Sequence, residues 1–476
     1  MPTLKSDPCE LTAVECLQSF RSGALSPVEL TRAVLARIAR LNPRLNAFAL
    51  LDEASALRQA QASEQAWLAH RREGAPVRAL EGIPTTIKDL VLTKGWPTLR
   101  GSWAIDADQV WDTDAPVTAR LREAGAVLLG KTTTPEFGCK GETNSPRSGA
   151  TLNPWDLSKS PGGSSGGAAA AVAAGLGPLG VGTDGAGSVR IPAAFCGHVG
   201  LKPSFGRVPA YPLSPFGTVA HLGPHTMSVE DAALMLTVMA QPDARDWTSL
   251  PPDPRDYRIG LSQGIRGLRV AYSPTLGYAR NIDPDVAVAV DRGVKLLADL
   301  GACVEAVDPG FEDPLPITTG LWFAGSAALW RGLTESQRAR TDPDFAEQAR
   351  IGQTISIEQA HSLSMQRGAL GSHMRQFMQQ WDILVTPSVA IPAFDSRPPG
   401  QAPMSSEVML GWTPFSYPFN LTQQPAITVP CGLSRYGLPL GIQFVGRMFD
   451  DVTVLRVARA FESVCPVARP SLNWAG

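Results

Sequence analysis

The feature of this sequence that most constrains its fold is a stretch of small residues between positions 153 and 203, where Gly and Ser surround one Ala-rich run at 168–174. Side chains this small let backbone segments approach closely, and a loop rich in Gly can direct several N–H groups to one point. We interpret the stretch as a loop, a buried helix of small residues, a glycine loop, a strand at 181–183 and another loop.

Around this stretch the chain alternates between helical and strand-like segments. Residues 115–124 are helical and lead into an apolar run at 126–131, and a helix at 284–300 leads into a run at 302–307 in the same way. This alternation is typical of an α/β fold in which helices cover a sheet. We expect less regular structure from about 310 to 410, then late strands at 426–430 and 440–445 and a closing helix at 452–465.

The amino-terminal part reads as helices. Ser26-Pro27-Val28-Glu29 is a capping box with Pro at the first helical position, and the helix that follows is expected to end at Asn42-Pro43. A second helix is expected at 54–73. We therefore predict an N-terminal helical arm over residues 1–75, packed on a single domain that spans 76–476.

Composition excludes several classes of protein. Lys plus Arg number 42 and Asp plus Glu number 44, so the net charge of −2 lacks the basic excess of a nucleic-acid binder. The charge-free stretches at 160–183 and 408–434 are too rich in small residues or Pro to span a membrane, and the amino terminus lacks a secretion signal. The seven Cys form no C-x-x-C pair, which favours reduced thiols, a cytoplasmic location and no structural zinc.

Two short motifs suggest other chemistry and are disfavoured by their context. Residues 175–180 match G-x-G-x-x-G, but they follow a helix rather than a strand and contain Pro178, so we expect no dinucleotide cofactor. Residues 162–166 match G-x-S-x-G, but Ser160-Pro161 stands where the strand of an α/β-hydrolase should be, and the last histidine is His373.

Three other histidines are interpreted as structural. His221 and His225 share the spacing of H-E-x-x-H, but Leu222 replaces the Glu and Gly223-Pro224 interrupts the helix that this motif needs. Together with His198 they are expected to be satisfied within the fold. We therefore expect no catalytic metal.

The complete stretch carries a denser pattern. Two serine motifs, Gly162-Gly-Ser-Ser-Gly-Gly167 and Gly182-Thr-Asp-Gly-Ala-Gly-Ser-Val-Arg190, accompany an isolated lysine in the apolar run Ile83-Pro-Thr-Thr-Ile-Lys-Asp89. This combination strongly resembles the amidase signature family, including the distance of 24 residues between Ser164 and Ser188. The resemblance extends over most of the chain, through matching text at Thr134–Gly138, Asn153–Trp155, Phe195–Gly197, Gly200–Pro203, Thr386-Pro387, Asn420-Leu421, Gln424-Pro425 and Gly437–Pro439.

The resemblance implies a large, mixed, twisted β-sheet covered by helices on both faces, and a Ser–cisSer–Lys triad. Ser188 is then the nucleophile, Ser164 the bridging serine and Lys88 the base, with a cis peptide bond between Gly163 and Ser164. The other site residues that it implies are the oxyanion hole, Gly185, Ala186, Gly187 and Ser188, and the supporting residues Gly163, Ser165, Asp184 and Arg190. The commonest family text has two Gly where this chain has Ala186-Gly187, which questions a left-handed conformation at 186.

The chemistry is reasonable for these residue types. A serine hydroxyl is a poor nucleophile until a base removes its proton, and lysine can be that base only when it is neutral. Burial lowers a lysine pKa, and Lys88 lies among apolar neighbours. Asp89 follows it directly, but consecutive strand side chains point to opposite faces, so Asp89 need not restore the charge.

The substrate is expected to be a small apolar or aryl amide, and esters or carbamates are open. We expect a variable region at about 310–420 to supply pocket residues, together with the loop at 137–138; the candidates are Phe137, Gly138, Trp322, Met409, Trp412 and Phe415. One alternative is the amidase component of a glutamine-dependent tRNA amidotransferase, which is disfavoured because residues 360–380 contain no Tyr. Another is a non-catalytic subunit of the same fold. The expected partners are the amide and water, without cofactor, nucleic acid or membrane, in a monomer or homodimer.

Overall fold

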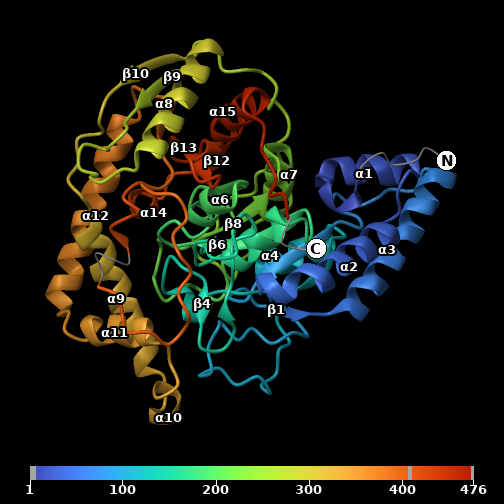
Figure 1. Ribbon diagram of the computed structural model, residues 1–476, viewed down its shortest axis with the longest axis horizontal. Helices are drawn as coiled ribbons and strands as arrows, with labels where there is room; N and C mark the ends of the chain where they lie inside the picture. Colours follow the sequence, from blue (N-terminus) through green and yellow to red (C-terminus); the bar gives the residue numbers. More distant parts are fainter. Residues whose placement is uncertain (1–6, 406–409, 473–476) are drawn as a thin grey trace.

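The computed structural model describes residues 7–405 and 410–472, and its centre is one large mixed sheet (Figure 1). Eleven strands of the described residues are hydrogen-bonded in the order β1-β3-β2-β6-β8-β7-β12-β13-β11-β9-β10. The strands are β1 (Phe48–Leu51), β2 (Pro84–Lys88), β3 (Val127–Thr132), β6 (Leu179–Asp184), β7 (Val199–Lys202), β8 (His221–Thr226), β9 (Arg269–Tyr272), β10 (Cys303–Ala306), β11 (Ile383–Pro387), β12 (Ala426–Leu433) and β13 (Pro439–Gly446).

The sheet combines two parallel groups with an antiparallel centre. Strand β2 runs parallel to both β3 and β6, and β9 runs parallel to both β10 and β11. Between these groups, neighbouring strands from β6 to β11 pair antiparallel. The α/β fold class is therefore confirmed, as are the two late strands, which are β12 and β13. A separate small hairpin pairs β4 (Asn144–Ser145) with β5 (Gly149–Ala150).

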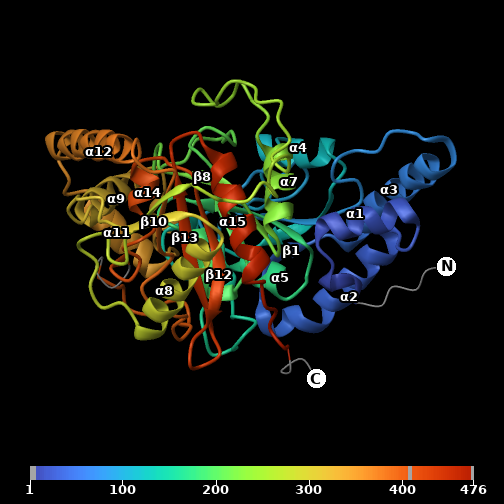
Figure 2. The same cartoon turned by 90° about the horizontal axis from the view of Figure 1, so that it is seen from above.

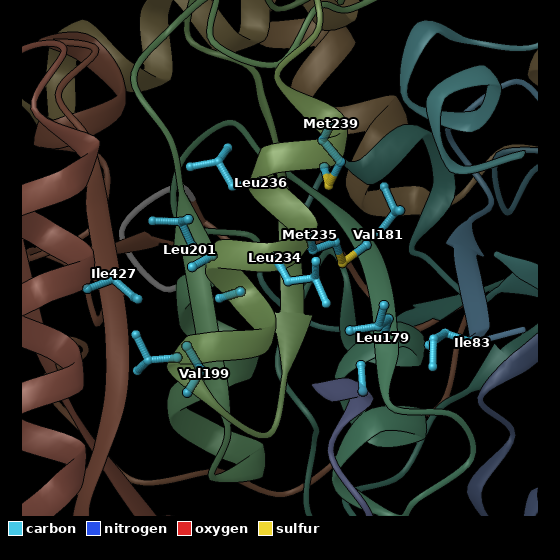
Figure 3. Packing of buried hydrophobic residues seen from close by; sticks show 14 of the residues in the cluster. Ile83, Leu179, Val181, Val199, Leu201, Leu234, Met235, Leu236, Met239 and Ile427 are labelled. Atoms are coloured by element: carbon cyan, nitrogen blue, oxygen red, sulfur yellow. The ribbon is translucent and has the colours of Figure 1, made fainter. Parts of the chain in front are cut away.

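Helices cover both faces of the sheet (Figure 2). One face carries the two short helices of small residues, α5 (Gly166–Ala173) and α6 (Arg190–Cys196), and the other carries α4 (Pro116–Glu123), α7 (Val229–Met239), α8 (Pro284–Asp299) and α15 (Asp451–Val464). Figure 3 shows Leu234 and Met235 of α7 among side chains of β6 and β7, all within one buried cluster. Every residue of α5 is buried, as expected for its small side chains.

The amino-terminal part contains α1 (Ala13–Ser22), α2 (Pro27–Leu45) and α3 (Glu53–Glu73), which lie together at one side of the molecule (Figure 1). The capping box is present, since the Ser26 side chain accepts a hydrogen bond from the backbone of Glu29. The expected end of α2 at Asn42-Pro43 was wrong. Pro43 removes only one N–H donor near the end of the helix, which closes at Asn46, where the backbone is left-handed and its N–H donates to the Asn42 carbonyl at 2.7 Å. The part is also not purely helical, because β1 joins the main sheet beside β3.

The expectation of less regular structure from about 310 to 410 was also wrong. The chain there forms α9 (Leu315–Arg331), α10 (Glu335–Arg338), α11 (Pro343–Gly352) and α12 (Ile357–Phe377). Capping boxes begin α10 at Thr334 and α12 at Ser356, and Asp342 caps α11. These start signals are local and were readable in the sequence. In the described ranges, no helix is both long enough and apolar enough to cross a membrane.

Candidate active site

The candidate site lies at the carboxyl ends of the neighbouring parallel strands β2 and β6. Lys88 is the last residue of β2, and Ser188 lies on the turn between β6 and α6. Ser164 lies just before α5, whose first turn packs beside β6. The fold thereby brings together three residues that are far apart in the sequence, at the edge where open α/β sheets bind their ligands.

Lys88 is enclosed by hydroxyl groups. Its Nζ lies 2.7 Å from Oγ of Ser164, 2.9 Å from Oγ of Ser165 and 2.8 Å from Oγ1 of Thr183. Burial lowers the pKa of Lys88 far below its ordinary value, against a smaller opposing effect of the Asp184 charge. Within residues 7–405 and 410–472, no carboxylate forms an ion pair with this amine. Asp89 faces away, as expected, and its Oδ1 lies 4.0 Å from Nζ of Lys131.

Ser164 and Ser188 line the same cavity. Both are buried, but the Ser188 hydroxyl accepts and donates no hydrogen bond within the described part of the chain, so it is free to meet a ligand. The peptide bond between Gly163 and Ser164 is cis, which is the geometry that the resemblance implies. Gly163 allows a close approach of two backbones, because a Cβ there would lie 2.6 Å from backbone atoms of Glu142.

The turn that carries Ser188 is held by the buried carboxylate of Asp184. This carboxylate accepts hydrogen bonds from Nε and Nη2 of Arg190 at 2.9 and 3.0 Å, and from the N–H of Gly187 at 2.7 Å. Burial alone would raise the pKa of Asp184, but the Arg190 guanidinium and these hydrogen bonds hold it well below its usual range. Asn420 and Gln443 accept further N–H groups of Arg190, so the pair is enclosed by polar partners.

The backbone carbonyls of the turn are also held. The Asp184 carbonyl accepts from Asn420 Nδ2, the Ala186 carbonyl from Ser416 Oγ, and the Gly187 carbonyl from the N–H of Ile191. A trans peptide directs its N–H opposite to its carbonyl. The N–H groups at 185 and 188 are therefore directed away from these partners, and neither these two nor the N–H at 186 has a hydrogen-bond acceptor in the described structure.

Two residues of the expected oxyanion hole need comment. The N–H of Gly187 is already used by Asp184, which leaves Gly185, Ala186 and Ser188 as the available donors. The left-handed conformation lies at Gly187, with φ of 123°, and not at Ala186. A Cβ at 187 would lie 2.5 Å from Oγ of Ser416. The turn thus needs glycine at 187 and tolerates alanine at 186.

The cavity is lined mainly by apolar side chains. Of the sequence-predicted pocket residues, Phe137, Gly138 and Trp322 line it. The Trp322 ring stacks on Phe216 at 3.8 Å between ring centroids. The space they enclose, counted out to its open mouth, is about 890 Å³, within the range of small-molecule sites.

The other predicted pocket residues lie elsewhere. Trp412 does not line the cavity but stacks on Phe195 of α6 at 5.5 Å. Phe415 is fully buried in a cluster with Phe419 and does not reach the cavity either. Met409 lies outside the described residues. The two tryptophans have similar sequence surroundings, so only the tertiary packing separates Trp322 from Trp412.

Two of the three central histidines lie away from the cavity. The rings of His198 and His225 form a buried hydrogen bond of 2.8 Å between Nε2 and Nδ1. His221 lines the cavity, with Nδ1 2.8 Å from the Val219 carbonyl, and burial keeps its pKa far below the ordinary value. The G-x-G-x-x-G residues form the connection between α5 and β6. No group of three or more His, Cys, Asp or Glu in the described ranges is arranged to hold a metal ion.

Several site residues were missed from the sequence. Thr183 could have been found, because strand alternation turns it away from the Asp184 side chain and toward the neighbouring strand that carries Lys88. Arg100 and the loop at 210–216 also line the cavity. They carry no local signal, since only the tertiary fold brings them to the serine motifs.

Comparison with known proteins agrees with this geometry. The family model described as Amidase matches residues 29–455, nearly the whole chain. The chain belongs to the amidase signature family. Its homologues and structural neighbours are amidases, so the chain is a hydrolase that acts on amides.

Its relatives include both acylamidases and components of a tRNA-dependent amidotransferase. An acylamidase of Rhodococcus erythropolis is 40% identical over 466 residues, which cover 96% of each chain. The amidase component of the glutamyl-tRNA(Gln) amidotransferase of Myxococcus xanthus (strain DK1622) is 36% identical, and the match covers 95% of this chain and 97% of that one. Among solved structures, a bacterial aryl acylamidase of the same family superimposes with a TM-score of 0.87 at 28% identity, over 96% of both chains.

Proposed function

We propose that this protein is a stand-alone serine amidohydrolase that cleaves a small apolar or aryl amide through an acyl-enzyme on Ser188. Ser164 relays the proton and Lys88 is the base. The observation that carries the proposal is the buried amine of Lys88, which has no ion-pair partner in the described structure and lies 2.7 Å from the hydroxyl of Ser164. A lysine in this setting is held in the neutral form that a base requires.

The three hydroxyls around Lys88 also support a neutral amine. A neutral amine carries two N–H donors and one lone pair. The Ser165 hydroxyl donates to the Thr183 carbonyl at 3.1 Å, so toward Lys88 it acts as an acceptor. If Thr183 accepts the second N–H, the lone pair of Nζ faces the hydroxyl of Ser164, and the amine is ready to take that proton.

Acylation then proceeds in two proton transfers. Oγ of Ser188 attacks the substrate carbonyl carbon as its proton passes to Oγ of Ser164, whose own proton passes to Nζ of Lys88. The N–H groups of Gly185, Ala186 and Ser188 would donate to the resulting oxyanion, and a donor of this kind contributes about 3–4 kcal/mol. Lys88 returns the proton through Ser164 to the amide nitrogen, the C–N bond breaks, and the amine leaves.

Deacylation repeats the same relay with water. Water attacks the ester carbon as its proton passes through Ser164 to Lys88. The second tetrahedral intermediate collapses, the bond to Ser188 Oγ breaks, and this oxygen recovers the proton. The carboxylic acid leaves and the starting state of the three residues is restored. The apolar lining of the cavity, with Trp322 stacked on Phe216, supports an apolar or aryl substrate part.

The test is hydrolysis of a 4-nitroanilide by Ser188→Ala. We expect kcat/KM to fall by roughly 10⁴-fold or more, with little change in thermal unfolding, because the Ser188 hydroxyl has no hydrogen-bond partner in the described structure. Ser463→Ala, an exposed serine on α15, is the matched control and should keep the activity. Full activity in Ser188→Ala would refute the nucleophile. Parallel rates on a primary amide, an ester and a carbamate define the preferred bond.

The alternative is the amidase component of a tRNA-dependent amidotransferase, which the 36% identity to the Myxococcus xanthus protein keeps in view. That function would make glutamine the preferred amide and activity dependent on partner proteins. Hydrolysis of an anilide, but not of glutamine, by the purified chain alone would exclude it.

A further inference from the structure

The cavity contains one charged group that the proposed chemistry does not use. Arg100 lines it beside the apolar side chains of Leu90 and Val91 and is itself only partly exposed. Its guanidinium forms no hydrogen bond and no ion pair with any described residue. Buried guanidinium groups are ordinarily paired, because removing such a charge from water is costly. An unpaired one at a ligand cavity is therefore a candidate recognition group.

The backbone holds Arg100 firmly at this position. Its N–H donates to the Asp89 carbonyl at 3.0 Å, and its carbonyl accepts from the N–H of Phe137 at 2.9 Å. The residue adopts a left-handed conformation with φ of 56°, which side chains other than glycine adopt seldom. These contacts tie Arg100 to the wall of the cavity formed by the segments around Leu90 and Phe137.

The charges around Arg100 leave it available to a ligand. No Asp or Glu is among the described residues that line the cavity. The nearest acidic influence is Asp89, but that carboxylate accepts from the N–H of Leu99 at 3.1 Å and faces Lys131. Burial keeps His221 neutral, so Arg100 is the one charged side chain in this lining as far as the structure describes it.

We propose that Arg100 binds a carboxylate on the substrate, so that the preferred substrates are amides whose apolar or aryl part carries a carboxylate group. This inference rests on the proposed function, because it assumes that the cavity holds the amide that Ser188 attacks. Arg is suited to this role, since its planar guanidinium binds a carboxylate through two parallel hydrogen bonds. The mainly apolar lining would hold the remainder of such a substrate.

The test compares pairs of 4-nitroanilides matched in chain length, one with a terminal carboxylate on the acyl chain (glutaryl) and one without (pentanoyl). A second pair carries the carboxylate on the amine side, as 3-carboxy-4-nitroanilide against 4-nitroanilide. We expect wild type to prefer the carboxylate-bearing member of at least one pair by about 10-fold or more in kcat/KM, as charge-assisted hydrogen bonds suggest. Arg100→Gln should bring that ratio close to one, and Arg100→Lys should retain part of it.

Arg147 provides the matched control. It is also a partly exposed arginine, but it stacks on Trp103 and does not line the cavity, so Arg147→Gln should leave the ratio unchanged. The inference is overturned if wild type shows no preference in either pair, or if Arg100→Gln lowers both members of a pair equally.

A binding measurement separates this inference from the proposed function. In the Ser188→Ala background, calorimetric titration with glutaryl-4-nitroanilide needs no hydrolysis. Addition of Arg100→Gln should weaken the binding by about 10-fold or more, and equal binding in the two variants would overturn the inference. Absence of hydrolysis of every anilide by wild type would instead contradict the proposed function, while this titration would still test Arg100.

Discussion

Replacement of Asp184 by asparagine keeps the size of this side chain and removes its charge. Arg190, which lies 2.9 Å away through Nε, would then remain fully buried without its counter-ion. Loss of one partner from a buried ion pair costs about 3–5 kcal/mol. The new amide group would also face N–H donors where the carboxylate had only acceptors, which leaves a buried donor unsatisfied and adds about 1–3 kcal/mol.

We therefore expect Asp184→Asn to lower the free energy of unfolding by about 4 kcal/mol or more, measured by urea denaturation at neutral pH. It should also lower kcat, because the N–H of Gly187 would lose the acceptor that fixes the turn beside Ser188. The matched control is Glu347→Gln, whose partner Arg350 is exposed and whose loss should cost less than about 1 kcal/mol.

The pH dependence follows from the same contacts. The pKa of Asp184 is lower in the folded chain than in the unfolded chain, so the carboxylate stabilises the fold above the unfolded pKa of about 3.9. Its contribution is lost only as the pH falls through the lower, folded pKa. The stability difference between wild type and Asp184→Asn should thus stay constant down to about pH 4 and shrink below it. A loss below about 1 kcal/mol with kcat retained would refute the reasoning.

Two further predictions follow from other buried groups. Because burial lowers the pKa of Lys88 and the neutral amine is the base, kcat/KM on a neutral anilide should rise with pH and reach its plateau well below the ordinary lysine pKa; a midpoint near about pH 10.4 would contradict this. Asp231 of α7 accepts hydrogen bonds from the N–H groups of Ala13 at 2.8 Å and Val14 at 3.0 Å, so it caps α1. Asp231→Ala should cost about 1–2 kcal/mol in urea denaturation, and an unchanged midpoint would show that α1 does not depend on this cap.

Local patterns in the sequence predicted much of the fold. The alternation of helices with apolar runs anticipated a covered sheet, and the small residues of α5 anticipated its complete burial. The errors arose where tertiary contacts or weak local signals decide. Strand β1 forms only because β3 offers an edge for it, and the helices between 315 and 377 have start signals that the expectation of irregular structure passed over.

The same division applies to the site. Lys88, Ser164 and Ser188 were found because their motifs are dense and ordered along the chain. The contacts that decide their chemistry were not readable: Thr183 completes the hydroxyls around Lys88, and Asp184 withdraws the N–H of Gly187 from the oxyanion hole. Trp322 and Trp412 could not be separated by sequence, since both lie in aromatic surroundings and only one reaches the cavity.

The measurement that tests the central claim most directly is the rate of covalent labelling by a fluorophosphonate as a function of pH, with the labelled peptide identified by mass spectrometry. The account predicts one adduct on Ser188, a labelling rate that increases as Lys88 loses its proton, and a loss of roughly 10³-fold or more with that pH dependence in Lys88→Met. An adduct on another serine, or labelling of Lys88→Met at the wild-type rate, would contradict it.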